Sequence, residues 1–273
     1  MSVRARDARL PGRTIGINGL AGNLGIALAA LVTGLIVKYF GWRMAFVVPA
    51  LVSVGCGLLF ARLSPPEGEP PARRKAAADP LPPSVLLRVV IVITVIATTS
   101  ALLFNFTTNG NTELLRERMA AVVADPAALG VLLALVYAVA ALSQLLVGSL
   151  IDRVPIKRLL LAIVALQPPL FLAASQAHGW AFFVLIILFM GAVFGAIPFI
   201  DAIIVRFVDD RIRSQVAGAR LAISFSISSL AVYLLGPVVK SAGFDALLLT
   251  MAAIAVVTFA AASWLPSAGA PSR

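Results

Sequence analysis

Long apolar stretches separated by short polar segments dominate the chain from Thr14 onward. A hydrocarbon core about 30 Å thick needs about 20 apolar residues of helix, because backbone groups in lipid must bond within the segment. Eight stretches meet this requirement, and we expect an all-α membrane protein of eight transmembrane helices. The predicted spans are residues 14–37, 44–61, 85–107, 127–151, 158–175, 180–204, 215–239 and 243–265.

Composition supports lipid as the main solvent. Apolar residues make up 60% of the chain and charged residues only 12%, whereas about a quarter of a soluble domain is charged. The net charge of +10 lies between the apolar blocks, so we expect a lipid bilayer and no nucleic acid as partner. A single Cys and a single His exclude an internal disulfide and argue against a metal centre, so we expect no cofactor and no metal.

The loop charges predict the topology, because Lys and Arg are retained on the cytoplasmic side of a membrane. With a cytoplasmic N-terminus, fifteen of these residues flank the spans on the cytoplasmic side and five lie on the other side. The five are Lys38, Arg43, Arg116, Arg118 and Lys240. We therefore expect a multi-pass protein of the cell inner membrane with both termini in the cytoplasm.

Two polar segments interrupt the apolar pattern. Residues 62–84 contain a proline-rich run and a basic cluster, which predicts a solvated cytoplasmic linker. Residues 109–126 favour a solvated loop with charge pairs among Glu113, Arg116 and Glu117. A helix lying at the outer membrane interface is the alternative for this second segment.

A weak internal repeat appears when the chain is shifted by 202 residues. The run GLIVKYFGW from Gly34 then aligns with GPVVKSAGF from Gly236, and Gly41 coincides with Gly243. Four identities in nine positions can arise by chance in so apolar a sequence, and this alternative stays open. Both copies run from the inside to the outside and precede a returning span, which favours a parallel repeat.

Three local patterns stand out between the predicted spans. The clearest is GSLIDRVPIKRLLL (Gly148 to Leu161), which resembles the loop motif between helices eight and nine of the major facilitator superfamily of transporters. The run GWRMAF (Gly41 to Phe46) and the basic loop RFVDDRIRSQVAGAR (Arg206 to Arg220) are similar to further parts of it. Its members have twelve helices in two parallel halves with substrate near the midplane.

The resemblance implies which helices are present. It covers the fifth to twelfth helices, so the bundle lacks its first four. Residues 1–61 would hold the last two helices of the N-terminal half, residues 62–84 the linker, and residues 85–273 the six-helix C-terminal half. We expect little transport by this chain unless the absent part is supplied.

The resemblance also implies a function. It predicts a secondary active transporter, not an enzyme, that moves a small solute by alternating access, with proton coupling as an option. A non-catalytic membrane scaffold or assembly protein is the alternative. An integral-membrane transferase is a weaker one, because the sequence offers one His and no acidic or His-containing transferase motif.

Charged residues at the predicted cytoplasmic side are candidates for a conformational latch or gate. By resemblance, Asp152, with Arg153 and Arg158 after it, would close against the first span at Thr14 to Gly16. Asp201 is an acid within the predicted span 180–204, and its position near the cytoplasmic end favours a gate or a salt bridge to Arg206 or Arg220. The candidate latch and gate residues are Asp152, Arg153, Arg158, Asp201, Arg206 and Arg213. A solvated loop charge is the alternative for Asp152.

Amide side chains within the spans are candidates for a solute cavity. Asn23, Asn105 and Gln144 would lie near the middle or toward the outer half of their helices. In lipid such groups need partners, so interhelical hydrogen bonding without any ligand is the alternative reading for each.

Overall fold

The computed structural model describes residues 39–63, 83–207 and 213–265, together with Ile17, Gly22, Gly25, Val32 and Ile36. All regular secondary structure in this part of the chain is helical, which confirms the all-α class. The helices are α3 (Met44–Leu63), α4 (Pro83–Met119), α5 (Pro126–Ile151), α6 (Ile156–Gln176), α7 (Gly179–Phe207) and α8 (Arg213–Ser263). These six helices are each long and apolar enough to cross a membrane.

The predicted count of eight helices is not matched by the six that the structure describes. Residues 215–239 and 243–265 were expected as separate spans, but both belong to the single element α8. Gly243 interrupts α8 with φ 76° and ψ 177°, so the chain reverses there between two helical segments. Most of the other predicted span, 14–37, lies outside the described residues.

The polar stretch 109–126 is largely helical and continues α4, so the predicted solvated loop is wrong up to Met119. The average hydropathy of this stretch did not predict the helical extension, because the extension is amphipathic. Leu114, Leu115 and Met119 are at most 1% exposed, while Glu113 and Arg116 pair on the solvated side with an N···O distance of 3.4 Å. Apolar residues on one face of a helix bury that face even where the average composition is polar.

Local chemistry explains several helix boundaries. Asp125 precedes α5, and its carboxylate accepts a hydrogen bond from the Ala128 amide at 3.0 Å, which satisfies an N-terminal donor of the helix. Pro126 occupies the first helical position, where its missing N–H costs nothing. Gly179 starts α7 with φ 57°, and a Cβ there would lie 3.2 Å from Val122 Cγ2. The turn between α6 and α7 therefore lies close to the turn between α4 and α5.

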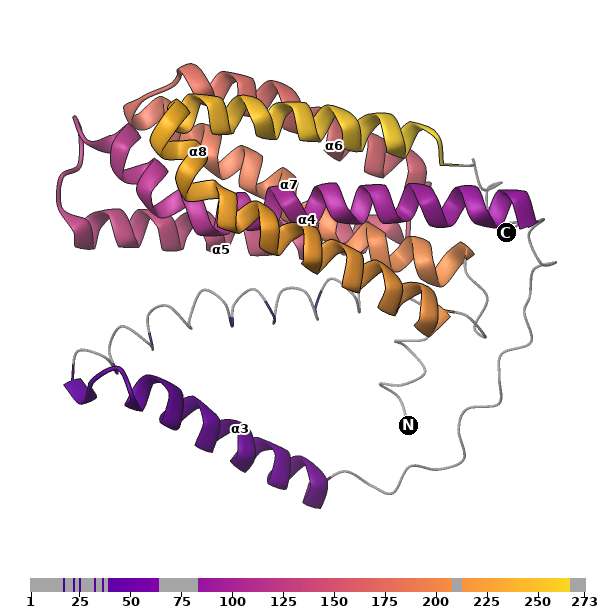
Figure 1. Ribbon diagram of the computed structural model, residues 1–273, viewed down its shortest axis with the longest axis horizontal. Helices are drawn as coiled ribbons and strands as arrows, with labels where there is room; N and C mark the ends of the chain where they lie inside the picture. The colour runs from indigo at the N-terminus through magenta and orange to yellow at the C-terminus, as the bar shows by residue number, and fades with distance from the viewer. Residues whose placement is uncertain are drawn as a thin grey trace. The chain divides into compact units, whose positions relative to one another are not determined.

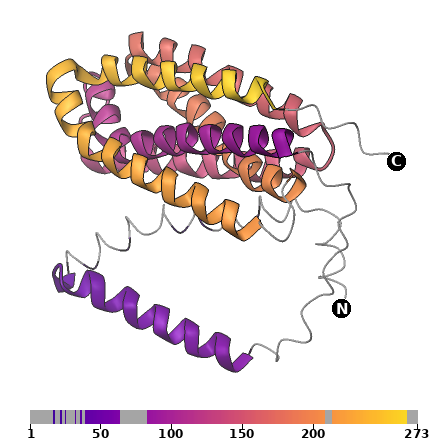
Figure 2. The same ribbon diagram turned by 45° about the vertical axis from the view of Figure 1, so that its right-hand side comes forward.

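The chain divides into two compact units, residues 22–79 and residues 1–21 with 80–273. The first unit contains α3, which has no buried residue. In the second unit α4 to α8 lie side by side as a bundle, and Figures 1 and 2 show the two segments of α8 reversing at one end of it. α8 packs mainly against α4 and α6, and α7 packs against α4, α5 and α6.

Helix α7 is the central element of the bundle. Its fully buried side chains include Phe182, Ile186, Phe189 and Phe199, which contribute to two apolar clusters toward its two ends. Phe171 of α6 stacks against Phe189 with ring centroids 5.0 Å apart. Because α7 packs mainly against three other helices and also contacts α8, polar groups that face it lie in the interior of the bundle.

Candidate functional site

The polar contacts of the bundle lie at three levels along α7. His178 precedes the first residue of α7, and Asp201 lies 22 residues after Gly179, which is about 33 Å along a helix. This separation is close to the thickness of a bilayer's hydrocarbon core, about 30 Å. The charged contacts near His178 and Asp201 therefore belong to opposite ends of the bundle.

At the His178 end, a buried arginine joins three segments of the chain. The side chain of Arg118, at the C-terminal end of α4, is only 3% exposed. Its guanidinium lies 2.8 Å from His178 Nε2 in the turn before α7, and it also donates to the carboxylate of Asp245, two residues after the α8 reversal. Glu117 lies 4.0 Å from Arg118 Nε. We call Arg118, His178 and Asp245 the arginine cluster.

Sequence reasoning missed the arginine cluster and placed Arg118 among ordinary loop charges. A signal was available, since Arg118 lies four residues after Leu114 and beside Met119 on the buried face of the α4 extension. His178 and Asp245 each lie within two residues of a glycine with positive φ, Gly179 or Gly243. Turn glycines next to charged residues mark where loops meet at one end of a bundle.

At the opposite end, Asp201 of α7 pairs with Arg220 near the start of α8, with an N···O distance of 3.4 Å. Arg220 is 11% exposed and Asp201 is 55% exposed, so the carboxylate reaches solvent. The structure therefore brings Asp201 together with one of its two expected partners. The side chains of Arg206 and Arg213 lie outside the described residues.

The other latch residues follow α5. Asp152 is partly buried in the turn after Ile151, and Arg153 and Arg158 follow in the turn and the first part of α6. Lys157 donates to the backbone carbonyl of Leu265, which ties the start of α6 to the end of α8. The proposed docking of Asp152 on residues 14–16 falls outside the described residues and stays a prediction.

At the middle level, three consecutive residues of α7 accept hydrogen bonds from three different helices. Asn111 of α4 donates to Met190 Sδ at 3.2 Å, Ser143 of α5 donates to the Gly191 carbonyl at 2.8 Å, and Gln167 of α6 donates to the Ala192 carbonyl at 3.1 Å. Consecutive helical residues point about 100° apart. These contacts therefore hold α7 from three sides, and we call them the α7 girdle.

The three cavity candidates have different surroundings. Gln144 is 1% exposed, and neither atom of its side-chain amide has a hydrogen-bond partner. Asn105 is half-buried and donates to the Ala101 carbonyl of its own helix at 2.8 Å. Asn23 lies outside the described residues. Of the two candidates that the structure describes, Gln144 is the one with a buried amide whose donor and acceptor are both available.

The described residues contain no group of three or more His, Cys, Asp or Glu placed to hold a metal ion. Several charged groups of the described bundle are paired with one another or with backbone carbonyls, as in the arginine cluster and at Lys157. Such pairs position helices.

Apolar helices of membrane-spanning length, joined by interior polar contacts, define a multi-pass helical membrane protein. Residues 7–118, less than half of the chain, match the family model of the Major Facilitator Superfamily. The predicted resemblance to a transporter of this superfamily is confirmed by this match, which includes α3 and nearly all of α4. The comparison with curated proteins gives no match. The correspondence to the fifth to twelfth helices stays a prediction.

Proposed function

We propose that this protein is a secondary active transporter of the major facilitator type that moves a small solute across the membrane by alternating access. The observation that carries the proposal is the family match over residues 7–118, because members of that superfamily are transporters rather than enzymes. The membrane-spanning length of the six described helices is consistent with it.

The backbone at the predicted repeat supports a two-part architecture. Gly41 and Gly243, which coincide at the 202-residue offset, have φ values of 82° and 76°. Gly41 precedes α3, and Gly243 precedes the second segment of α8, so each glycine starts a returning helix. A positive φ is costly for residues with a Cβ, so the shared conformation gives the sequence match a physical reason. It favours a true repeat over chance.

Charge pairing within the bundle supports movement as a rigid body. The arginine cluster ties α4, α8 and the turn before α7 at one end, and Asp201 with Arg220 ties α7 to α8 at the other. The α7 girdle joins α4, α5 and α6 to α7 at the middle. Contacts within one body persist when that body rocks. In this proposal Asp201 stiffens the bundle, and Asp152 is the group whose contact changes during transport.

The proposed orientation follows the loop charges. The Asp201 end would face the cytoplasm with both termini, and the arginine cluster would face the outside, in a cell inner membrane. Gln144 is proposed to contact the solute, because a buried amide with neither atom paired is costly unless a ligand or water completes its bonds. Proton coupling remains an option without an assigned residue.

The test begins with solute binding by the purified chain. Its melting temperature would be measured with sugars, amino acids, organic anions and lipophilic cations, and each stabilising compound would be tested for uptake into proteoliposomes with and without a pH gradient. We expect one solute class to stabilise the chain and Gln144→Leu to remove that effect. A protein partner that co-purifies, with stabilisation by no solute class, would favour the scaffold instead. Strong uptake by this chain alone would contradict the expected truncation.

A further inference from the structure

His178 is the single histidine of the chain, and it lies in the arginine cluster. Its Nε2 atom is 2.8 Å from Nη1 of Arg118. A guanidinium stays protonated and can only donate hydrogen bonds, so Nε2 must be the acceptor in this contact. His178 is therefore held as the neutral imidazole with its proton on Nδ1. The contact exists only while Nε2 carries no proton.

Protonation of His178 would turn this attraction into a repulsion. Nε2 would then carry a hydrogen that points at an N–H group of Arg118, and two cations would lie within contact distance. The side chain of Arg118 is 3% exposed. Water screens charges poorly at such a buried position, so the repulsion is stronger there than on the surface. The hydrogen bond cannot form in this state, and the two side chains must separate.

The acidic groups around the cluster offset this repulsion only in part. Asp245 of α8 and Glu117 of α4 both lie near Arg118, but their side chains are 62% and 55% exposed, so water and salt screen them. Asp125 lies in the neighbouring turn between α4 and α5, where its carboxylate caps α5. The last turn of α6 and the first turn of α7 carry no charged side chain. Among these charged groups, the one that His178 contacts by a hydrogen bond is a cation.

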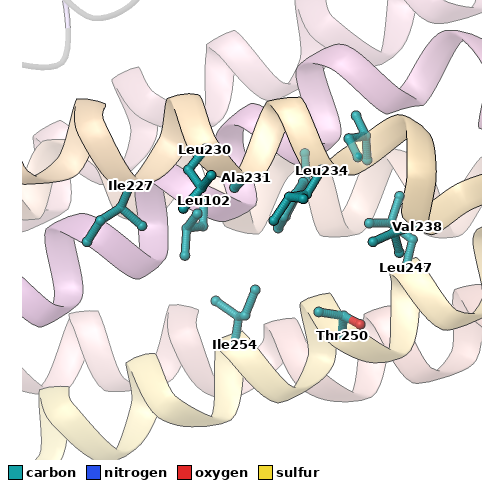
Figure 3. A pocket seen from close by; sticks show the side chains of 11 residues that line it. Leu102, Ile227, Leu230, Ala231, Leu234, Val238, Leu247, Thr250 and Ile254 are labelled. Atoms are coloured by element: carbon teal, nitrogen blue, oxygen red, sulfur yellow. The ribbon is translucent and has the colours of Figure 1, made fainter.

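The packing of α4 against α8 next to the cluster is incomplete. Figure 3 shows a groove between α4 and the two segments of α8, and its lining includes Leu247, two residues after Asp245. The volume of the groove is about 320 Å³, and apart from Thr250 its lining side chains are apolar. Side chains across such a space lose part of their mutual contact. The arginine cluster therefore holds α4 and α8 together at an end where packing alone does so weakly.

We propose that the arginine cluster is a pH-sensitive clamp that opens when His178 takes up a proton on Nε2. In the closed clamp Arg118 donates to His178, and in the open clamp the start of α7 separates from the end of α4. An unperturbed histidine changes its charge at roughly pH 6.5. A contact made only by the neutral imidazole stabilises the fold above this range and is lost as the pH falls through it. The clamp responds to the pH on its own side of the membrane and is independent of the transported solute.

Nitrogen NMR with isotope-labelled histidine tests the protonation of His178 directly, because the chain contains one histidine. At about pH 8 we expect two distinct ring signals, one from a protonated Nδ1 and one from an Nε2 that accepts a hydrogen bond. At about pH 5 both nitrogens should be protonated. A proton on Nε2 at about pH 8 would overturn the proposal, because Arg118 would then have no acceptor on this ring.

Thermal unfolding of the full chain in detergent tests the opening of the clamp. The matched control is His178→Gln, which offers an oxygen acceptor to Arg118 but does not titrate. Between about pH 8 and about pH 5, the melting temperature of the wild type should fall by about 2 to 4 °C more than that of His178→Gln. Amide hydrogen exchange in residues 176–180 should also rise more in the wild type than in this variant. Equal changes in the two proteins would contradict the clamp, since the carboxylates that they share would then explain the whole effect.

Discussion

Arg118 Nη1 and His178 Nε2 lie 2.8 Å apart, although 60 residues separate them in the sequence. This contact joins the end of α4 to the turn that begins α7. Asp245 meets the same guanidinium from α8, so one buried cation gathers three parts of the chain at one end of the bundle. The pattern of apolar spans did not predict the arginine cluster. The cluster places paired charges at one end of the bundle.

Removing the carboxylate from this cluster should destabilise the bundle. In Asp245→Asn, the guanidinium of Arg118, which is 3% exposed, loses its closest anionic partner. A cation buried without its partner is strongly destabilising, but Asp245 is 62% exposed, so we expect a reduced loss of about 1 to 2 kcal/mol. Thermal unfolding in detergent would measure it.

The matched control for Asp245→Asn is Glu113→Gln. Glu113 pairs with Arg116, but both side chains are at least 60% exposed. Exposed pairs contribute little, so its melting temperature should stay close to that of the wild type. Equal losses of stability in Asp245→Asn and Glu113→Gln would contradict this prediction, because the burial of Arg118 would then make no difference.

Gly195 of α7 lies close to Val147 of α5. A Cβ at this position would lie 3.2 Å from Val147 Cγ2, whereas a Cβ at Gly191 would meet nothing within 4 Å. Replacing a helical glycine with alanine contributes about 0.5 to 1 kcal/mol of stability where space allows. We expect that gain for Gly191→Ala and a smaller gain or a loss for Gly195→Ala. Adding Val147→Ala should then give a favourable coupling energy in a double-mutant cycle.

Gln144 and Gln167 allow a buried amide without a partner to be compared with one that is hydrogen-bonded. Both are 1% exposed, but Gln167 donates to the Ala192 carbonyl, while both amide atoms of Gln144 have no partner. Replacing an unpaired buried polar group with an apolar one of similar shape is neutral or stabilising, whereas a lost hydrogen bond costs about 1 kcal/mol. Gln144→Met should therefore unfold at a higher temperature than Gln167→Met. The reverse order would indicate that Gln144 has a partner in the folded protein.

Asp152→Asn tests the proposed latch. The substitution removes a charge in the turn after α5 and should lower the transport rate while membrane insertion is unchanged. Transport assays in cells or proteoliposomes that also supply the expected absent helices, with protein level measured in the membrane fraction, would report both effects. Glu113→Gln serves again as a charge-removing control at the opposite end of the bundle. Unchanged uptake kinetics in Asp152→Asn would contradict the latch. Asp152 would then act only as a loop charge that helps to set the topology.

Several features of the fold were predictable from local sequence. The expected spans 44–61, 127–151, 158–175 and 180–204 lie within α3, α5, α6 and α7, because twenty apolar residues report directly on a helix that satisfies its own backbone in lipid. The turn at Gly243 was also predictable from the break between two spans. The extension of α4 to Met119 was not, because its apolar face is hidden in an average over polar neighbours.

The candidate site was less predictable. The sequence placed Asp201 near a membrane surface and named Arg220 as one possible partner, which the structure brings to 3.4 Å. It named Gln144 for its amide but could not show that both amide atoms stay unpaired. Asn105 donates to the Ala101 carbonyl of its own helix, and its expected place at a cavity stays a prediction.

The sequence by itself determined the solvent of this protein and the length of its helices, because both depend on composition within single segments. Only the tertiary structure decided which faces meet. Arg118 contacts Asp245 across 127 residues, and Asn111, Ser143 and Gln167 reach three adjacent residues of α7. Such pairings depend on how helices pack in three dimensions, and the hydropathy pattern of single segments does not specify which residues of different helices meet.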